Sequence, residues 1–248
     1  TTPDTLQEEP LDLEKETLLS LMDRLPLTLY FHNDEPNPRS LDTTTKIDYL
    51  TSYTDYRAML ERYQKEYSFG LDAQKAMEAR EDIESFFIEY VDQGLKELEV
   101  FVELLWEELV NGRRINLTVK GFASPLAKSD YNVNLAKRRI ASLKNYLKLK
   151  DEGKFMPFLQ DTAENGGYLT FTEIPFGEYV ANEFVSDNLN DKKNSVYSRA
   201  AGLERKIEIQ SINFLPQPDD TKDAISSENF IEKEIPVRPI KQVIELGK

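Results

Sequence analysis

The stretch Ile115–Leu147, INLTVKGFASPLAKSDYNVNLAKRRIASLKNYL, decides how the rest of the chain is interpreted. Apolar and polar residues alternate from Ile115 to Val119, which predicts a strand, and Gly121 closes it. Polar loop residues follow. An amphipathic helix is then expected over residues 130–148, with its apolar side facing inward. The stretch therefore predicts a strand, a loop and a helix that lie next to one another in a mixed fold.

Three further strands are expected on either side of this stretch. Leu25–Phe31 alternates and is rich in β-forming residues, and the prolines and asparagines of residues 32–39 predict the loop that follows it. Tyr168–Ile174 predicts the third strand, and Arg205–Phe214 predicts the last one. Residues 175–200 are expected to form a long polar excursion between these two. Strands and helices together predict an α+β fold, an α/β sandwich.

Two long helices are expected between the first and second strands. The apolar positions of the first helix recur every 3 or 4 residues and form one stripe: Tyr49, Tyr53, Tyr56, Leu60, Tyr63 and Tyr67. A row of tyrosines is compatible with a ligand or sugar platform, but a packing seam with its hydroxyls at the wet edge is the favoured interpretation. The second helix is expected over residues 73–110, a length of roughly 55 Å. This length predicts an antiparallel hairpin that protrudes from the body, and Gly94 predicts a kink or a close approach.

Composition restricts the class of protein. Hydrophobic residues make up 40% of the 248 residues and aromatic residues 10%, which supports a folded core. The formal net charge of −14 argues against binding to nucleic acid or to an anionic membrane surface, because both require a basic face. The sequence has no cysteine, no apolar run near the about 20 residues that span a bilayer, and no secretory signal at its start. A soluble chain, a trimmed mature form and an excised domain all agree with these facts.

Several residues at fixed spacing resemble the OmpA-like peptidoglycan-binding domain, which has a β-α-β-α-β-β body. The family pattern is a glycine-aromatic turn, a loop, and then Tyr-Asn-x-x-Leu-x-x-x-Arg-Ala at the start of an apolar helix. In this chain the pattern corresponds to the following residues: Gly121-Phe122, Tyr131-Asn132, Leu135 and Arg139. The usual Arg-Arg-Val-Glu-Ile of the last strand is similar to RKIEI at Arg205–Ile209. The resemblance implies an OmpA-like body over residues 25–214, with an enlarged helical hairpin at about residues 45–94 between strands 1 and 2.

The resemblance implies non-covalent binding of the peptidoglycan stem peptide, chiefly of its diaminopimelate residue. In the family an aspartate after the glycine-aromatic turn meets the ammonium group of this residue. The helix arginine holds its carboxylate, because a guanidinium binds a carboxylate through two parallel hydrogen bonds. Arg139 occupies the arginine position, whereas Ser124 occupies the aspartate position and brings no charge. Asp34 and Glu35 in the first loop are therefore candidates for the missing acid, with a solvated turn as the alternative.

Three more residues belong to the expected site or to its border. Asn132 either caps the helix or touches the ligand. Arg205 is a candidate ligand-binding residue, although bracing of the last strand toward Arg139 through an acid is the favoured role. Arg138 points about 100° away from Arg139 around the helix and is expected at the surface.

The sequence predicts a binding protein and not an enzyme. The single histidine, His32, has no second histidine or cysteine with which to form a triad or a zinc site, and no cofactor or metal is expected. The resemblance implies a cell-wall anchor in the periplasm, associated with the outer membrane and a candidate lipoprotein, that tethers an outer-membrane or periplasmic protein or complex. The alternative is a protein-interaction scaffold of an envelope complex that uses the hairpin and the tail. The expected domains are a lead-in segment (1–24), the OmpA-like domain (25–214) and a C-terminal tail (215–248).

Overall fold

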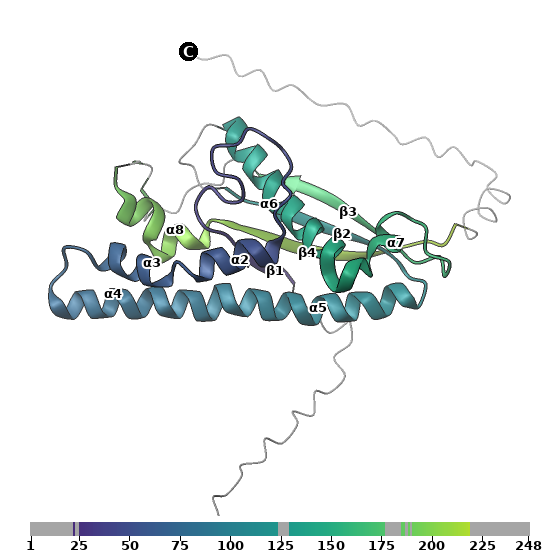
Figure 1. Ribbon diagram of the computed structural model, residues 1–248, viewed down its shortest axis with the longest axis horizontal. Helices are drawn as coiled ribbons and strands as arrows, with labels where there is room; N and C mark the ends of the chain where they lie inside the picture. Colours follow the sequence, from purple (N-terminus) through teal and green to yellow (C-terminus); the bar gives the residue numbers. More distant parts are fainter. Residues whose placement is uncertain are drawn as a thin grey trace, which may run out of the picture. The chain divides into compact units, whose positions relative to one another are not determined.

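A computed structural model describes residues 22, 25–123, 129–176, 185–186, 188 and 190–218 of the chain. Within these residues one mixed sheet is formed by four strands: β1 (Leu27–Tyr30), β2 (Arg114–Gly121), β3 (Tyr168–Pro175) and β4 (Lys206–Leu215). The strands lie in the order β1-β4-β2-β3 (Figure 1). β4 is antiparallel to both of its neighbours, whereas β2 and β3 are parallel. The expected mixture of helices with a four-stranded sheet is confirmed.

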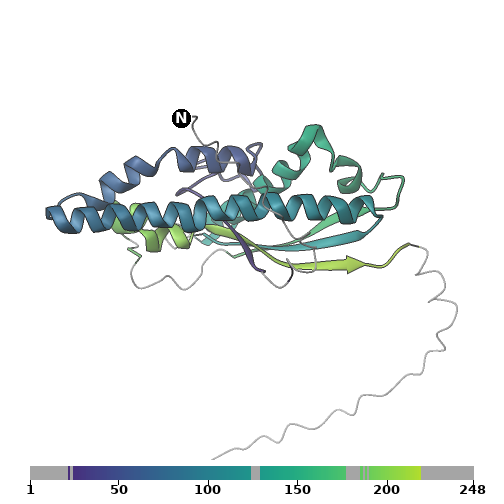
Figure 2. The same ribbon diagram turned by 90° about the horizontal axis from the view of Figure 1, so that it is seen from below.

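Helices cover one face of this sheet. Residues of β2 alternate between buried and partly exposed, as the sequence predicted, and Ile115, Leu117 and Val119 point into the core. The helices α5 (Gln93–Val110) and α6 (Ser129–Leu149) pack their apolar sides on these residues (Figure 2). The shorter helices α2 (Tyr49–Arg57) and α7 (Met156–Leu159) complete the same core. The opposite face of β2 presents polar side chains: Asn116, Thr118 and Lys120.

The long helix expected over residues 73–110 is confirmed as three consecutive helical segments. They are α4 (Ala73–Phe86), the π-helical segment η1 (Phe87–Asp92) and α5. Gly94 lies where this helix passes β1, and a Cβ atom on Gly94 would lie 2.6 Å from the carbonyl oxygen of Thr28. The glycine therefore permits the close approach of helix and strand that its position in the sequence predicted.

The first helix of the hairpin is divided in two, where a single helix was expected. α2 ends at Arg57, and α3 spans Leu60–Ser68. The tyrosine stripe nevertheless packs inward, since Tyr49, Tyr56 and Tyr63 are fully buried. The hydroxyl oxygens of Tyr49 and Tyr56 are buried as well, so the expected position of the hydroxyls at the wet edge is wrong for these two residues.

A second, aromatic core joins the hairpin to a later part of the chain. Its buried members are Tyr30, Tyr56, Tyr63, Ile83, Phe86, Phe87, Val91 and Tyr197. Tyr197 reaches this core from the π-helical turn η3 (Lys193–Tyr197), which precedes α8 (Arg199–Leu203). We expected the hairpin to protrude and residues 175–200 to form a polar excursion. The tip of the hairpin extends past the strands (Figure 1), and residues 177–184 of the expected excursion lie outside the described residues. The expectation is wrong for residues 192–203, which are largely helical and pack on the hairpin, where Arg199 forms an ion pair with Asp82 at 3.0 Å.

Contacts divide the chain into two units, Thr1–Leu215 and Pro216–Lys248. The described part of the second unit is residues 216–218, so most of the expected C-terminal tail lies outside the described residues. The expected lead-in segment also lies outside them, apart from Met22.

Candidate binding site at the end of the sheet

Three strands end and one strand begins at the same end of the sheet. Backbone hydrogen bonds of 2.7–2.9 Å tie these ends together: Phe31 N–H to the Arg205 carbonyl, Phe122 N–H to the Lys206 carbonyl and Phe176 N–H to the Gly121 carbonyl. The loop after β1 (residues 31–48) and the residues that follow β2 therefore meet the start of β4. This end of the sheet brings together most of the residues that the sequence nominated for ligand binding.

Arg139 is buried beneath this end of the sheet, and 1% of its surface is exposed. Its guanidinium donates hydrogen bonds to three backbone carbonyl oxygens, those of Glu35 at 3.0 Å, Phe122 at 2.6 Å and His32 at 3.4 Å. Burial, and then the charge of Arg205, lower the pKa of Arg139 to about 9. Arg139 therefore stays charged at neutral pH and connects the loop after β1 to the end of β2.

The expectation that Arg138 lies at the surface is wrong, because Arg138 is fully buried. Its Nε donates to the carbonyl oxygen of Pro36 at 2.9 Å, and its Nη1 donates to those of Ser40 at 2.7 Å and Asp42 at 2.9 Å. The loop after β1 folds over this side of α6 and encloses the side chain. Helical geometry alone placed Arg138 away from Arg139, but it gave no information about what covers that side of the helix.

Other side chains of α6 hold the same loop. The hydroxyl of Tyr131 donates to the carboxylate of Asp34 and accepts a hydrogen bond from the N–H of Arg39 at 3.0 Å. The amide of Asn134 donates to the carbonyl oxygen of Leu41 at 3.0 Å. Asp34 and Arg39 both have a φ of 63°, a left-handed conformation that these contacts support. The helix that carries the sequence motif therefore fixes the conformation of the loop after β1.

Arg205 is buried too, but among the described residues no acid is seen to connect it to the surroundings of Arg139, as was expected. Within the described residues its guanidinium donates to the backbone carbonyl oxygens of Ser195 and Val196, the latter at 2.8 Å. Arg205 thereby attaches η3 to the start of β4. Its role in this structure is to brace backbone, as it is for its two counterparts on α6.

We call these three buried residues the arginine cluster: Arg138, Arg139 and Arg205. In the part of the chain that the structure describes, none of them forms an ion pair with a carboxylate. Nδ1 of His32 lies 2.7 Å from the hydroxyl oxygen of Tyr63. Burial, and then the charges of Arg205, Arg62 and Arg139, lower the pKa of His32 to about 3. Three guanidinium groups therefore act on the surroundings of His32, and its imidazole is neutral at neutral pH.

The other residues nominated from the sequence differ in their placement. Glu35 is partly buried beside Asp34, and burial followed by the charge of Asp34 raises the pKa of Glu35 above its usual range. Asn132 lies in the first turn of α6 with 1% of its surface exposed. Ser124 lies outside the described residues. The structure therefore places Arg139, Asp34 and Glu35 around one loop.

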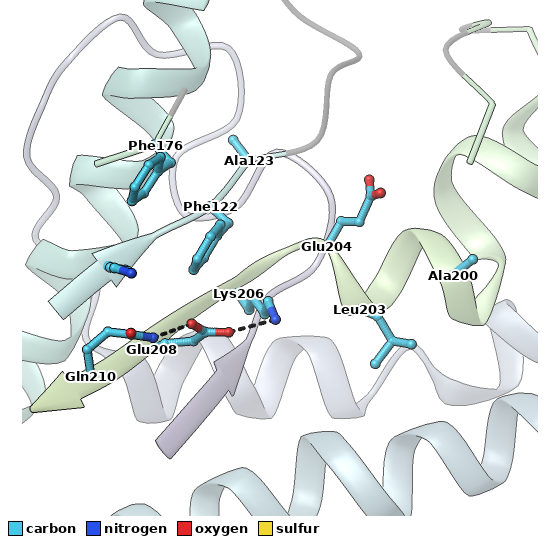
Figure 3. A pocket seen from close by; sticks show the side chains of 10 residues that line it. Phe122, Ala123, Phe176, Ala200, Leu203, Glu204, Lys206, Glu208 and Gln210 are labelled. Carbon is cyan, nitrogen blue, oxygen red and sulfur yellow. Dashed lines mark hydrogen bonds and ion pairs between the residues drawn. The ribbon is translucent and has the colours of Figure 1, made fainter. Parts of the chain in front are cut away.

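Arg139 bonds the backbone of Phe122, whereas the ring of Phe122 lines an open pocket of about 580 Å³. The pocket lies between α8 and the face of the sheet that carries polar side chains (Figure 3). Its lining is formed by Lys120, Phe122, Ala123, Phe176, Ala200, Leu203, Glu204, Lys206, Glu208 and Gln210. Sequence reasoning did not nominate these residues for ligand binding. The sequence feature that could have identified three of them is the alternation along the last strand, which places Lys206, Glu208 and Gln210 on the face opposite the buried isoleucines.

Aromatic and charged groups are paired within this pocket. The rings of Phe122 and Phe176 stack, with their centres 5.6 Å apart and their planes at 8°. Nζ of Lys206 lies 2.7 Å from one carboxylate oxygen of Glu208, and the amide of Gln210 donates to the other oxygen. Glu208 is 9% exposed, so this carboxylate is held firmly in the pocket wall.

Among the described residues, no group of three or more histidine, cysteine, aspartate or glutamate side chains is placed to hold a metal ion. None of the helices in the described ranges is both long and apolar enough to cross a membrane. No protein family, curated protein or solved structure matches this chain.

Proposed function

We propose that the chain binds peptidoglycan non-covalently through the diaminopimelate residue of its stem peptide. In this role it anchors an outer-membrane or periplasmic protein or complex to the cell wall. The arginine cluster is the observation that carries the proposal. It places three guanidinium groups at one end of the sheet with no carboxylate ion pair among the described residues. Because buried charges are weakly screened, such a site attracts the carboxylate of a ligand.

The order of the elements supports this proposal. Strand β1 is followed by the helical hairpin, then by β2, α6, β3 and β4, which agrees with the β-α-β-α-β-β body of OmpA-like domains. The glycine-aromatic pair Gly121-Phe122 lies at the end of β2, and Tyr131, Asn132 and Arg139 lie on α6. This position of the motif residues on β2 and α6 supports the proposal.

Arg139 supplies the carboxylate-binding half of the proposed site. Its bond to the carbonyl oxygen of His32 is long at 3.4 Å, whereas its bonds to Glu35 and Phe122 measure 3.0 Å and 2.6 Å. A ligand carboxylate that replaces the weak bond leaves the two stronger bonds intact. The guanidinium is thus held in place while one of its N–H groups binds the ligand.

Glu35 is the better of the two candidates for the ammonium-binding half. The carboxylate of Asp34 already accepts hydrogen bonds from the hydroxyl of Tyr131 and the N–H of Arg39. Glu35 is partly buried, and its raised pKa shows that burial and the charge of Asp34 disfavour its charged form. A ligand ammonium placed beside Glu35 lowers the pKa of this carboxyl group again, because an adjacent positive charge favours the carboxylate.

The test uses the full chain, purified sacculi and a diaminopimelate tripeptide. Retention on sacculi and the calorimetric affinity for the tripeptide are measured for the wild type, Glu35→Gln and Arg139→Lys. Glu61→Gln, at an exposed position of α3, is the matched control. We expect both site variants to lose about tenfold or more in affinity, equivalent to about 1.4 kcal/mol, while the control binds like the wild type. Equal retention of all four proteins contradicts the proposal.

The alternative function, a protein-interaction scaffold, is favoured by one surface feature. Apolar side chains are exposed at the turn between α3 and α4, namely Phe69 by 79% and Leu71 by 37%, and near the start of α4, namely Met77 by 57%. Exposed apolar groups at one tip are typical of contact surfaces. The variant Phe69→Ser with Met77→Ser tests this function: a scaffold loses defined envelope partners in cross-linking but keeps sacculus binding. Unchanged partners in this variant contradict the scaffold function.

A further inference from the structure

We propose that the pocket beside Phe122 binds a neutral sugar, an N-acetylated hexosamine residue. This inference rests on the proposed function, because peptidoglycan joins such sugars covalently to the stem peptide. One residue, Phe122, connects the pocket to the arginine cluster. The carbonyl oxygen of Phe122 accepts a hydrogen bond from Arg139, and the ring of Phe122 lines the pocket. One polymer can therefore contact both places, with its peptide at the loop after β1 and its glycan at the pocket.

The volume and the apolar lining of the pocket suit a sugar ring. About 580 Å³ falls within the range of roughly 300–1,000 Å³ that is usual for small-molecule sites. Phe122 and Phe176 form one side of the pocket, and Ala200 and Leu203 of α8 form the other (Figure 3). Sugar rings present C–H groups that pack against aromatic rings, and an acetamido methyl group needs a small apolar surface of the kind that Ala200 and Leu203 provide.

The balance of charge favours a neutral ligand. The pocket is lined by two lysines and two glutamates, so their formal charges sum to zero: Lys120, Lys206, Glu204 and Glu208. Lys206 and Glu208 are paired with each other at 2.7 Å. An anionic or cationic ligand requires an excess of the opposite charge, which the arginine cluster provides for an anion and this pocket does not.

The polar groups are arranged to donate and accept hydrogen bonds in fixed positions. Glu208 accepts from Lys206 and from the amide of Gln210, which holds all three side chains in one row along β4. The Lys206 ammonium has further N–H donors, and the carbonyl oxygen of the Gln210 side chain is an acceptor. Hydroxyl and acetamido groups of a sugar both donate and accept, so such a row can satisfy them without any change of charge.

The test follows backbone amide shifts of the full chain in NMR titrations with triacetylchitotriose, an N-acetylated sugar without peptide. The variants are Phe176→Ala and Gln210→Ala, and Asn213→Ala on the same strand, outside the pocket, is the matched control. We expect shifts centred on Phe122, Lys206 and Gln210. We also expect the dissociation constant to rise about tenfold in both pocket variants, as for loss of a central contact, and to stay unchanged in the control.

Three outcomes overturn the sugar site: no shifts at the pocket, equal affinity in the pocket variants and the wild type, or equally strong binding of cellotriose, which lacks acetamido groups. Parallel measurements separate this inference from the proposed function. Sacculus and tripeptide binding without chitotriose binding removes the sugar site alone. Chitotriose shifts that vanish in Phe176→Ala, without tripeptide binding, remove the stem-peptide proposal alone.

Discussion

The arginine cluster and the pocket lie on either side of Phe122, but they use their charges in opposite ways. On the helix side, three guanidinium groups are buried and bound to backbone carbonyl oxygens. On the open side, lysine and glutamate side chains balance one another along β4. The first arrangement fixes the conformation of the chain and leaves only the long bond from Arg139 to His32 to exchange with a ligand, whereas the second holds side-chain polar groups in an open pocket. The residues of the sequence motif therefore lie where the helix, the loop and the sheet are held together, and the open pocket lies beyond them.

The largest effect is expected from Arg138→Met, which removes the clamp between α6 and the loop after β1. The substitution leaves the carbonyl oxygens of Pro36, Ser40 and Asp42 without the guanidinium that now satisfies them. The contact with Pro36 is buried and the other two are partly buried, and a buried polar group without its partner costs about 1–3 kcal/mol, so we expect about 3 kcal/mol of lost unfolding free energy. Urea unfolding measures this loss.

Lys144→Met on the same helix is the matched control for this variant. Lys144 pairs with Glu173 at 2.8 Å, but both side chains are about one-third exposed, at 32% and 34%. An exposed ion pair contributes about 0.2–1 kcal/mol, so the control should stay close to the wild type. A loss in Arg138→Met as small as that in Lys144→Met contradicts a clamping role for Arg138.

Gly121→Ala is expected to act on the same side through packing. A Cβ atom on Gly121 would lie 2.9 Å from the carbonyl oxygen of Ala136 and 3.1 Å from its Cβ, so α6 must move away from the end of β2. We expect a loss of about 2 kcal/mol in unfolding free energy, typical of overpacking in a core. Amide shifts in the loop after β1 should change as well, because α6 holds that loop. Unchanged stability shows that the helix can move without strain.

The pH dependence of stability provides a third test of the buried side of Phe122, where His32 lies near Arg139 and Arg205. His32 binds a proton near its ordinary pKa of 6.5 in the unfolded chain, but in the folded protein its pKa is about 3. The folded state is therefore penalised as the pH falls from 6.5 toward 3, and at about pH 5 the loss is about 2 kcal/mol. Urea unfolding at about pH 7.5 and about pH 5, compared between wild type and His32→Gln, measures this term. The prediction fails if both proteins lose the same stability.

Local patterns predicted the elements of this fold better than they predicted the environment of single side chains. Alternation gave β2 and β4, and helical spacing gave α6, because these periods reflect which face is buried. The burial of Arg138 was missed because it depends on a loop distant in sequence that folds over α6. Phe176 was missed as a site residue because its stacking on Phe122 follows from the parallel pairing of β2 with β3. Contacts of this kind depend on topology, which spacing within one segment does not contain.

The smallest effect on stability is expected from Gln210→Ala in the pocket. Gln210 is partly buried and donates to a Glu208 carboxylate that Lys206 continues to hold, so the charge stays paired after the substitution. A net loss of about 0.5–1 kcal/mol is expected from one hydrogen bond of this kind. Urea unfolding of this variant beside Arg138→Met compares the two sides of Phe122 directly. If Gln210→Ala loses as much unfolding free energy as Arg138→Met, the pocket wall contributes as much to stability as the arginine cluster. The contrast between the two sides of Phe122 is then wrong.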